Sequence, residues 1–196
     1  MRTTLLVAVG FCCAALLPLR AESPFTCKFT IDSKEKVAEG SSLRLEYNVD
    51  GPKAFNGFWM KLGGQDRGNN FDASGFRKLT LRIKGDKNAG IPAMIRVEVK
   101  GDEGDVIGHY YVRTITPEWT RVEIPLDIYA TQGVQLAALN EFTIGFENKS
   151  ALPGAVKGAI WVDDVTLEGD GPPQILADFN KPDQNNVGGK WGTYTP

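Results

Sequence analysis

The chain of 196 residues has few of the residue patterns from which enzyme sites are commonly built. It has three cysteines and a single histidine, His109, and no serine or cysteine nucleophile motif accompanies them. No glycine-rich loop of the kind that cradles phosphate opens a helix. Lysine and arginine are scattered and the net charge is −2, so there is no broad basic footprint for nucleic acid. These absences argue against nucleophilic catalysis, nucleotide binding and nucleic-acid binding.

Residues 1–21 have the pattern of a signal peptide. A basic start precedes the apolar run 5–17, which is too short for a membrane span, and the stretch ends at the small residue Ala21. A lipoprotein anchor would require a small residue before its cysteine, whereas Phe11 precedes Cys12. The sequence therefore predicts a freely exported protein, secreted or periplasmic, with no membrane span.

Removal of that segment leaves one cysteine, Cys27, which could pair between chains. However, Phe25, Cys27, Phe29 and Ile31 alternate with polar residues and share one face of a strand. We therefore expect Cys27 to be a small buried apolar residue.

The remaining chain is dominated by alternating apolar and polar residues. This period of two is typical of strands in an antiparallel sheet with one packed face and one wet face. Examples of the apolar positions are Leu79, Leu81 and Ile83, then Ile95, Val97 and Val99, then Phe142, Ile144 and Phe146. Only residues 129–139 lean toward helix, and they lack a convincing cap. The prediction is a single all-β domain over residues 22–196, an antiparallel β-sandwich.

Three phrases carry a family resemblance: Asp-x-Ser-Gly-Phe followed by Leu-x-Leu-x-Ile-Lys-Gly-Asp (72–86), Glu-Trp-Thr-Arg-Val-x-Ile-Pro (118–125) and Ile-Trp-Val-Asp-Asp-Val-x-Leu (160–167). Their order resembles the galactose-binding-like jelly rolls. The chain looks closest to the carbohydrate-binding modules of bacterial glycan-degrading systems, and more distantly resembles the complex I intermediate-associated domains. The resemblance implies a non-catalytic module that binds a polysaccharide or oligosaccharide. A protein-interaction or structural module of the same fold is the alternative.

The C-terminal phrase is out of its usual order. Asp178-Phe179 and the run Asn185 to Tyr194 resemble the first strand and turn of those modules, yet they come last here. We interpret 175–196 as the first strand of a circularly permuted domain, since domain termini often lie close together. A truncated second module and strand exchange between chains are the alternatives. Trp191 and Tyr194 are expected to hold this strand in place, and a role as aromatic platforms for a sugar is the alternative.

A glycan site requires aromatic platforms beside groups that form hydrogen bonds with hydroxyls. The polar faces of the strands supply these groups, and we expect an exposed sheet face to dock the sugar. The predicted binding residues are Trp59, Lys61, Arg82, Arg96, Glu98, Tyr111, Arg113 and Glu147. Trp119 and Trp161 are expected to be structural. Glu98 and Glu147 could also meet as the two carboxylates of a glycosidase, the least favoured reading.

Related jelly rolls often hold a structural calcium, which prefers six to eight oxygen ligands. The resemblance places Asp163 or Asp164 at the ligand position of the last strand, and Asp178 at that of the first strand. Asn180 replaces the glutamate often found two residues after that aspartate, which weakens the match. A structural Ca²⁺ is therefore expected only as a possible cofactor.

Overall fold

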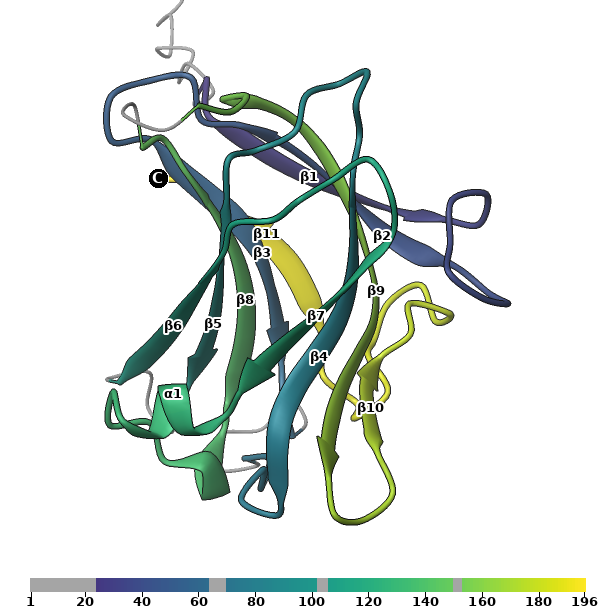
Figure 1. Ribbon diagram of the computed structural model, residues 1–196, viewed down its shortest axis with the longest axis vertical. Coiled ribbons are helices and arrows are strands. Elements are labelled where there is room, and N and C mark those ends of the chain that lie inside the picture. Colours follow the sequence, from purple (N-terminus) through teal and green to yellow (C-terminus); the bar gives the residue numbers. More distant parts are fainter. Residues whose placement is uncertain (1–23, 64–69, 102–105, 150–152) are drawn as a thin grey trace, which may run out of the picture.

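The computed structural model describes residues 24–63, 70–101, 106–149 and 153–196. Two antiparallel sheets pack face to face (Figure 1). The predicted all-β sandwich is thereby confirmed. The predicted signal peptide, 1–21, lies outside the described residues.

One sheet has six strands. Its order is β1 (Thr26–Asp32), β2 (Ser42–Asn48), β9 (Lys157–Gly169), β4 (Phe76–Gly85) and β7 (Thr120–Pro125), and β10 (Gln174–Ala177) also pairs with β9. A register shift in the β4–β9 ladder falls between Thr80 and Arg82.

The second sheet has five strands. Its order is β11 (Trp191–Tyr194), β3 (Phe55–Lys61), β8 (Glu141–Glu147), β5 (Ile95–Lys100) and β6 (Ile107–Val112). Most neighbours in both sheets are distant in sequence, so the chain crosses repeatedly between the sheets.

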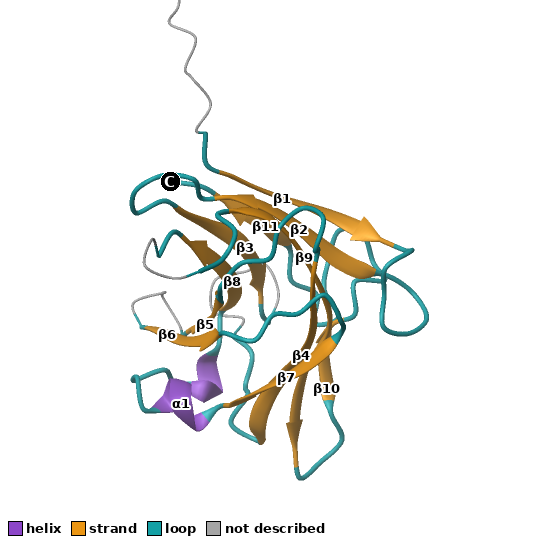
Figure 2. Ribbon diagram, turned by 45° about the horizontal axis from the view of Figure 1, so that its top comes forward, coloured by secondary structure: helices purple, strands orange, loops and turns teal. Residues whose placement is uncertain are grey.

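In the part of the chain that the structure describes, helical structure is confined to one connection. The turn α1 (Asp127–Ala130) and the 3-10 turn η2 (Leu136–Ala138) lie between β7 and β8 (Figure 2). The 3-10 turn lies within the segment 129–139 that the sequence marked as helix-leaning, and α1 overlaps its start. Among the described residues, no helix has the length and apolar character required to cross a membrane.

The core lies between the inner faces of the two sheets. The apolar positions of the predicted alternation fill it, and the fully buried members include Leu43, Leu45, Phe58, Met60, Leu79, Leu81, Ile83, Ile95, Val97, Phe142, Ile144 and Phe146. Tyr47 and Phe146, from opposite sheets, stack with ring centroids 4.3 Å apart. Cys27 is buried and free, as expected, and burial raises the pKa of its thiol to about 12.

The C-terminal segment is part of this sandwich. β10 pairs with β9 and β11 pairs with β3, while Phe179 and Trp191 are buried in the core. The C-terminus lies beside the start of β1 in both views (Figures 1 and 2). These residues are ordered strands rather than a frayed tail, and circular permutation stays a prediction.

Candidate functional site

The structure brings seven of the eight predicted binding residues to one surface, the outer face of the five-stranded sheet. Trp59 and Lys61 are on β3, Arg96 and Glu98 on β5, Tyr111 on β6 and Glu147 on β8, and Arg113 follows β6. Arg82 is the exception: it lies on β4 in the other sheet, opposite Arg121 and Asp163. Its alternation is that of an outward-facing strand residue, but alternation does not reveal to which sheet a strand belongs.

The strand register arranges this face in cross-strand rows. One row runs Gly192, Trp59, Thr143, Glu98, His109 across all five strands. The next runs Tyr194, Gly57, Gly145, Arg96, Tyr111. Side chains opposite one another in such rows are close enough to interact directly.

Trp59 is the first aromatic group of the face. It is partly exposed, and no hydrogen bond or cation contact of its indole occurs among the described residues. Its ring lies against Gly192 of β11, where an added Cβ would come within 2.8 Å of Cζ2. A glycine opposite the tryptophan therefore makes room for the ring on the sheet surface.

Tyr194 is a second aromatic group on this face, and the sequence had assigned it to holding the last strand. Its phenol extends from β11 over β3 to β8. A Cβ at Gly57 would lie 2.7 Å from its Oη, and one at Gly145 would lie 3.1 Å away. Burial raises the tyrosine pKa, so the hydroxyl stays protonated at neutral pH. Trp191 faces inward, with 8% of its surface exposed. Because side chains alternate along β11, Trp191 and Tyr194 point to opposite faces of the sheet. Which of the two points outward is determined only by the pairing of β11 with β3.

Arg96 occupies the centre of the face. Its guanidinium pairs with Glu147 on the neighbouring strand, and its Nε lies 2.7 Å from Glu98 Oε1 without hydrogen-bond geometry. Burial raises the pKa of Glu98, although the charges of Arg96 and Lys100 act in the opposite direction. The two glutamates therefore share one arginine.

Tyr111 extends this centre toward the edge strand. Its hydroxyl donates to Glu147 Oε2 at 3.4 Å, and the Arg113 guanidinium lies 5.9 Å from its ring centroid. His109 meets the same ring edge-on at 5.4 Å. Exposed donors on Arg113 and His109 thus flank an aromatic ring.

A third row, which we call the lysine row, comprises Lys190, Lys61, Glu141 and Lys100. Lys61 Nζ lies 2.8 Å from Glu141 Oε2, and Lys100 binds the other carboxylate oxygen. Although burial alone would raise it, these two lysines hold the pKa of Glu141 below its usual value. The backbone N–H of Lys61 donates to the carbonyl of Lys190 at 2.8 Å, which places Lys190 beside Lys61. Of this row, only Lys61 was predicted from sequence.

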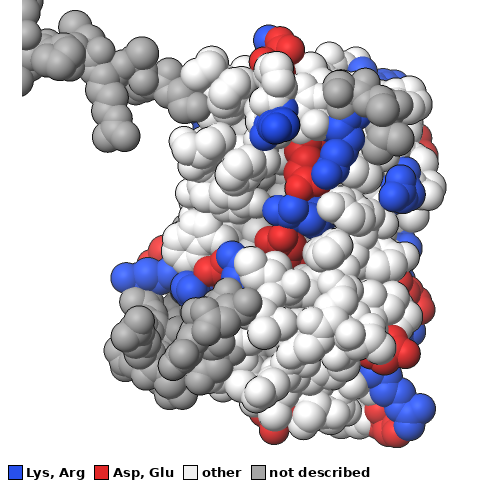
Figure 3. Space-filling view, turned by 90° about the vertical axis from the view of Figure 1, so that its left-hand side faces the viewer, with Lys and Arg blue, Asp and Glu red and all other residues white. Residues whose placement is uncertain are grey.

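Figure 3 shows the charged groups of this side of the molecule. Basic and acidic side chains alternate in a column down the face, surrounded mostly by uncharged surface. The column agrees with the ion pairs of Lys61, Arg96, Lys100 and Lys149 with the three glutamates.

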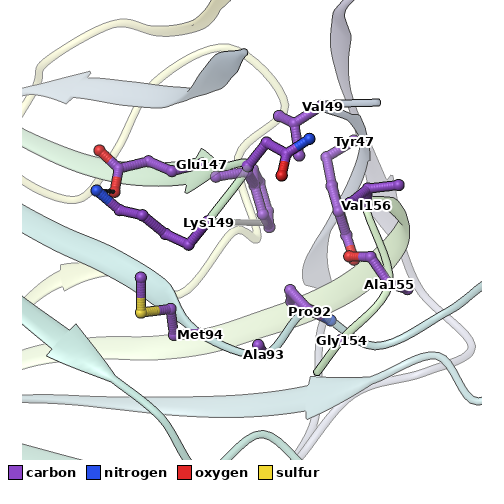
Figure 4. Close-up of a pocket in the computed structure, with 12 residues that line it drawn as sticks. Tyr47, Val49, Pro92, Ala93, Met94, Glu147, Lys149, Gly154, Ala155 and Val156 are labelled. Atoms are coloured by element: carbon purple, nitrogen blue, oxygen red, sulfur yellow. Dashed lines mark hydrogen bonds and ion pairs between the residues drawn. The ribbon is translucent and has the colours of Figure 1, made fainter. Parts of the chain in front are cut away.

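A pocket of about 270 Å³ adjoins the face at one end of the sandwich (Figure 4). Glu147 and Lys149 line one side of it, and Tyr47, Ala155 and Val156 line the opposite side. Apolar side chains such as Val49, Pro92 and Met94 line this pocket together with the polar residues Glu147, Asn148 and Lys149.

The predicted calcium ligands lie near one another on the six-stranded sheet. Burial raises the pKa of Asp163, and the charges of Asp164 and Asp178 contribute to the rise. The carboxylate oxygens of Asp163 accept backbone hydrogen bonds from Val37 at 3.1 Å and Asp164 at 2.8 Å. Among the described residues, no group of three or more acidic, histidine or cysteine side chains is arranged to hold a metal ion. Backbone carbonyls would have to supply most ligands, and calcium stays a prediction.

Comparison with solved structures supports the fold. A family 11 carbohydrate-binding module from a cellulosomal cellulase of Clostridium thermocellum is similar at 18% identity, with 76% of this chain and 84% of that chain covered and a TM-score of 0.50. A family 30 carbohydrate-binding module is similar at 15% identity, with 74% and 75% covered and a TM-score of 0.52. A β-1,2-glucanase from Parabacteroides distasonis is similar over 79% of this chain but only 23% of its own, at 18% identity and a TM-score of 0.51.

These structural neighbours include carbohydrate-binding modules. No protein-family model matches the sequence, and no curated protein matches it. At these identities the likeness establishes the fold alone.

Proposed function

We propose that the protein is an exported, non-catalytic carbohydrate-binding module that docks a polysaccharide or oligosaccharide on the outer face of the five-stranded sheet. The observation that carries the proposal is Trp59, a partly exposed indole with no hydrogen-bond partner among the described residues. Trp59 lies in the cross-strand row next to the row that contains Arg96. An apolar platform and the charged hydrogen-bonding groups around Arg96 therefore share a continuous surface.

Sugars present apolar C–H faces and hydroxyl edges, and this surface offers partners for both. An aromatic side chain carries about 150–250 Å² of surface. Covering a third of that at about 25 cal/mol/Å² contributes roughly 1.5 kcal/mol. One platform would bind weakly, so we assign Tyr194, Tyr111 and the Arg96 centre to the same site as Trp59.

The arrangement of Glu98 and Glu147 supports binding rather than hydrolysis. A glycosidase uses one carboxyl as proton donor and the other as nucleophile or base. Here both carboxylates are paired with Arg96, and Glu98 has 6% of its surface exposed. The proposal therefore includes no hydrolysis of the bound glycan.

The experiment is calorimetric titration of the purified protein and its Trp59→Ala variant with soluble β-glucans, xylans, mannans and acidic polysaccharides. For the glycan that binds, we expect Trp59→Ala to lower affinity about tenfold, because roughly 1.5 kcal/mol of stacking is lost. Trp119→Ala, which removes a half-buried tryptophan directly before β7 of the opposite sheet, is the matched control and should retain the affinity. A flat response to the whole panel by the folded protein would contradict the proposal and favour a protein partner.

A further inference from the structure

The outer face of the five-stranded sheet differs in charge from the rest of the molecule. The chain as a whole carries a net charge of −2. Among the residues that the structure describes, the cations on or beside this face are twice as numerous as its anions. The cations are Lys61, Lys100, Lys149, Lys190, Arg96 and Arg113, and the anions are Glu98, Glu141 and Glu147.

The excess is concentrated at the lysine row. Glu141 is its one anion, and both of its carboxylate oxygens are engaged, by Lys61 at 2.8 Å and by Lys100. One carboxylate therefore neutralises only one of these two cations. Lys190, the residue directly before β11, is exposed and forms no ion pair with a described residue. The row presents three ammonium groups around a single carboxylate.

Like charges opposite one another on neighbouring strands are destabilising. Lys190 directly precedes β11 and lies beside Lys61 in the same way, since the backbone N–H of Lys61 donates to the carbonyl of Lys190 at 2.8 Å. A bound anion would relieve this repulsion. The six-stranded sheet shows the balanced alternative, where Lys78 and Arg121 each contact both Glu123 and Glu168, two cations against two anions.

The row also adjoins the sugar platform. On β3 the side chains of Trp59 and Lys61 are successive residues of the outer face, because side chains alternate along a strand. Gly192 of β11, beneath the Trp59 ring, and Lys190, the residue directly before β11, are also two positions apart in the chain. A glycan stacked on Trp59 would therefore have its next substituents beside the ammonium groups of Lys61 and Lys190.

We propose that the lysine row makes this face selective for acidic polysaccharides, whose carboxylate or sulfate groups bind at Lys61 and Lys190 while a sugar ring stacks on Trp59. This inference rests on the proposed function and specifies its substrate class. Lys61 and Lys190 are the groups that determine this specificity. Glu141 reduces the preference for acidic glycans because its carboxylate neutralises part of the positive charge.

The test is calorimetric titration with polygalacturonate, which bears carboxylates, a sulfated galactan and an uncharged β-glucan. We expect at least one acidic polymer to bind about tenfold more tightly than the uncharged one, with affinity that falls as salt rises. A preference for polygalacturonate or for the galactan identifies the anionic group. Poly-L-glutamate, a polyanion without sugar rings, is the control and should bind more weakly than the preferred glycan.

Charge variants locate the effect on the row. Lys190→Gln and Lys61→Gln should each weaken binding of the acidic glycan about two- to fivefold, as expected for exposed charge contacts. Glu141→Gln should strengthen it by removing the competing anion. The matched control is Lys28→Gln, because Lys28 is an exposed strand lysine on β1 of the other sheet. It should leave the affinity unchanged.

The outcomes separate this inference from the proposed function. Tighter or equal binding of the uncharged β-glucan would overturn the acidic preference while the module function stands. Equal binding of poly-L-glutamate, or an equal loss in Lys28→Gln, would also overturn it, since the attraction would then be unspecific. No binding to any polysaccharide by the folded protein would contradict both.

Discussion

The outer faces of the two sheets carry the same kinds of side chain but use them differently. On the six-stranded sheet, Trp161 lies with Arg44 and Lys84 at 5.4 and 5.7 Å from its ring centroid, and its indole N–H donates to Asp32 at 3.0 Å. On the five-stranded sheet, Trp59 has neither a cation nor an acceptor among the described residues. A tryptophan whose bonding groups are satisfied within the protein stabilises the fold, whereas an unsatisfied one is free to bind a ligand.

Glycine is the second difference between the faces. Gly57 on β3, Gly145 on β8 and Gly192 on the edge strand β11 are positions of the five-stranded sheet where aromatic rings from β3 and β11 lie against the backbone. Glycine weakens a strand interior and often marks a close approach to the backbone. The glycines therefore lower the stability of the strands at the positions where aromatic side chains cover the surface of the five-stranded sheet.

The largest effect is expected from Gly57→Ala. The new Cβ would lie 2.2 Å from the backbone oxygen of Ile144 and 2.7 Å from Tyr194 Oη. Because a backbone atom cannot move aside, we expect a loss of about 2–3 kcal/mol in the free energy of unfolding and weaker glycan binding. Chemical denaturation measures the first and calorimetry the second. Gly171→Ala, where nothing lies within 4 Å of the added carbon, should change neither.

Trp161→Ala tests whether the tryptophan on the six-stranded sheet stabilises the fold rather than binding a glycan. The substitution removes two cation–π contacts and one hydrogen bond, so we expect about 2 kcal/mol lower stability in denaturant unfolding. Glycan affinity should be unchanged, the reverse of Trp59→Ala. A loss of affinity in the folded Trp161→Ala protein would place the binding surface on the six-stranded sheet.

The lysine row differs from the Glu98 region of the same face in how it makes stability depend on pH, because the pKa of Glu141 is lowered and that of Glu98 is raised. The pKa of Glu141 is lowered on folding by Lys100 and Lys61, even though burial opposes this. The contribution of Glu141 to the free energy of unfolding is therefore fully present above the pKa of this residue in the unfolded chain, about 4.5. It is lost as the pH falls through the lower pKa of the folded protein. We expect Glu141→Gln to cost about 1 kcal/mol at pH 7 and to flatten this acid limb in thermal unfolding. An unaltered acid limb would show that other carboxylates cause it.

The smallest effect is expected from calcium. If Asp163 and Asp178 contribute to a weak site, Ca²⁺ near its dissociation constant would raise stability by about 0.4 kcal/mol, or about 1–3 °C in melting temperature. Differential scanning fluorimetry with calcium or chelator would detect this shift. Asp163→Asn should abolish the calcium response, and a wild-type protein that melts identically in both conditions would argue against the site.

Much of the fold could be predicted because it rests on local alternation. Leu79, Leu81 and Ile83 are buried as their period of two indicated, and Cys27 is buried on its strand face. The same alternation identified Trp59, Arg96 and Tyr111 as outward residues. Arg82 shows the limit, since an identical local pattern placed it on a different surface.

Other parts of the site have no signal in a local pattern. Tyr194, Lys190 and Glu141 join the face through pairing between strands far apart in the chain. Trp119 and Trp161 were expected to be structural, and both lie on an outer face with their indole N–H groups donating to Glu35 and Asp32. Pairing partners, not side-chain types, separate these tryptophans from Trp59.

The sequence by itself determined that the chain forms strands, which residues of each strand face the core, and that one sandwich results. Alternation suffices for this because burial of one face is decided residue by residue along a strand. Only the tertiary structure decided which outward residues share a surface, because that depends on strand order and register. The pairing of β11 with β3 brings Tyr194 over Gly57 and Lys190 beside Lys61, and these two contacts create the aromatic and cationic character of the face.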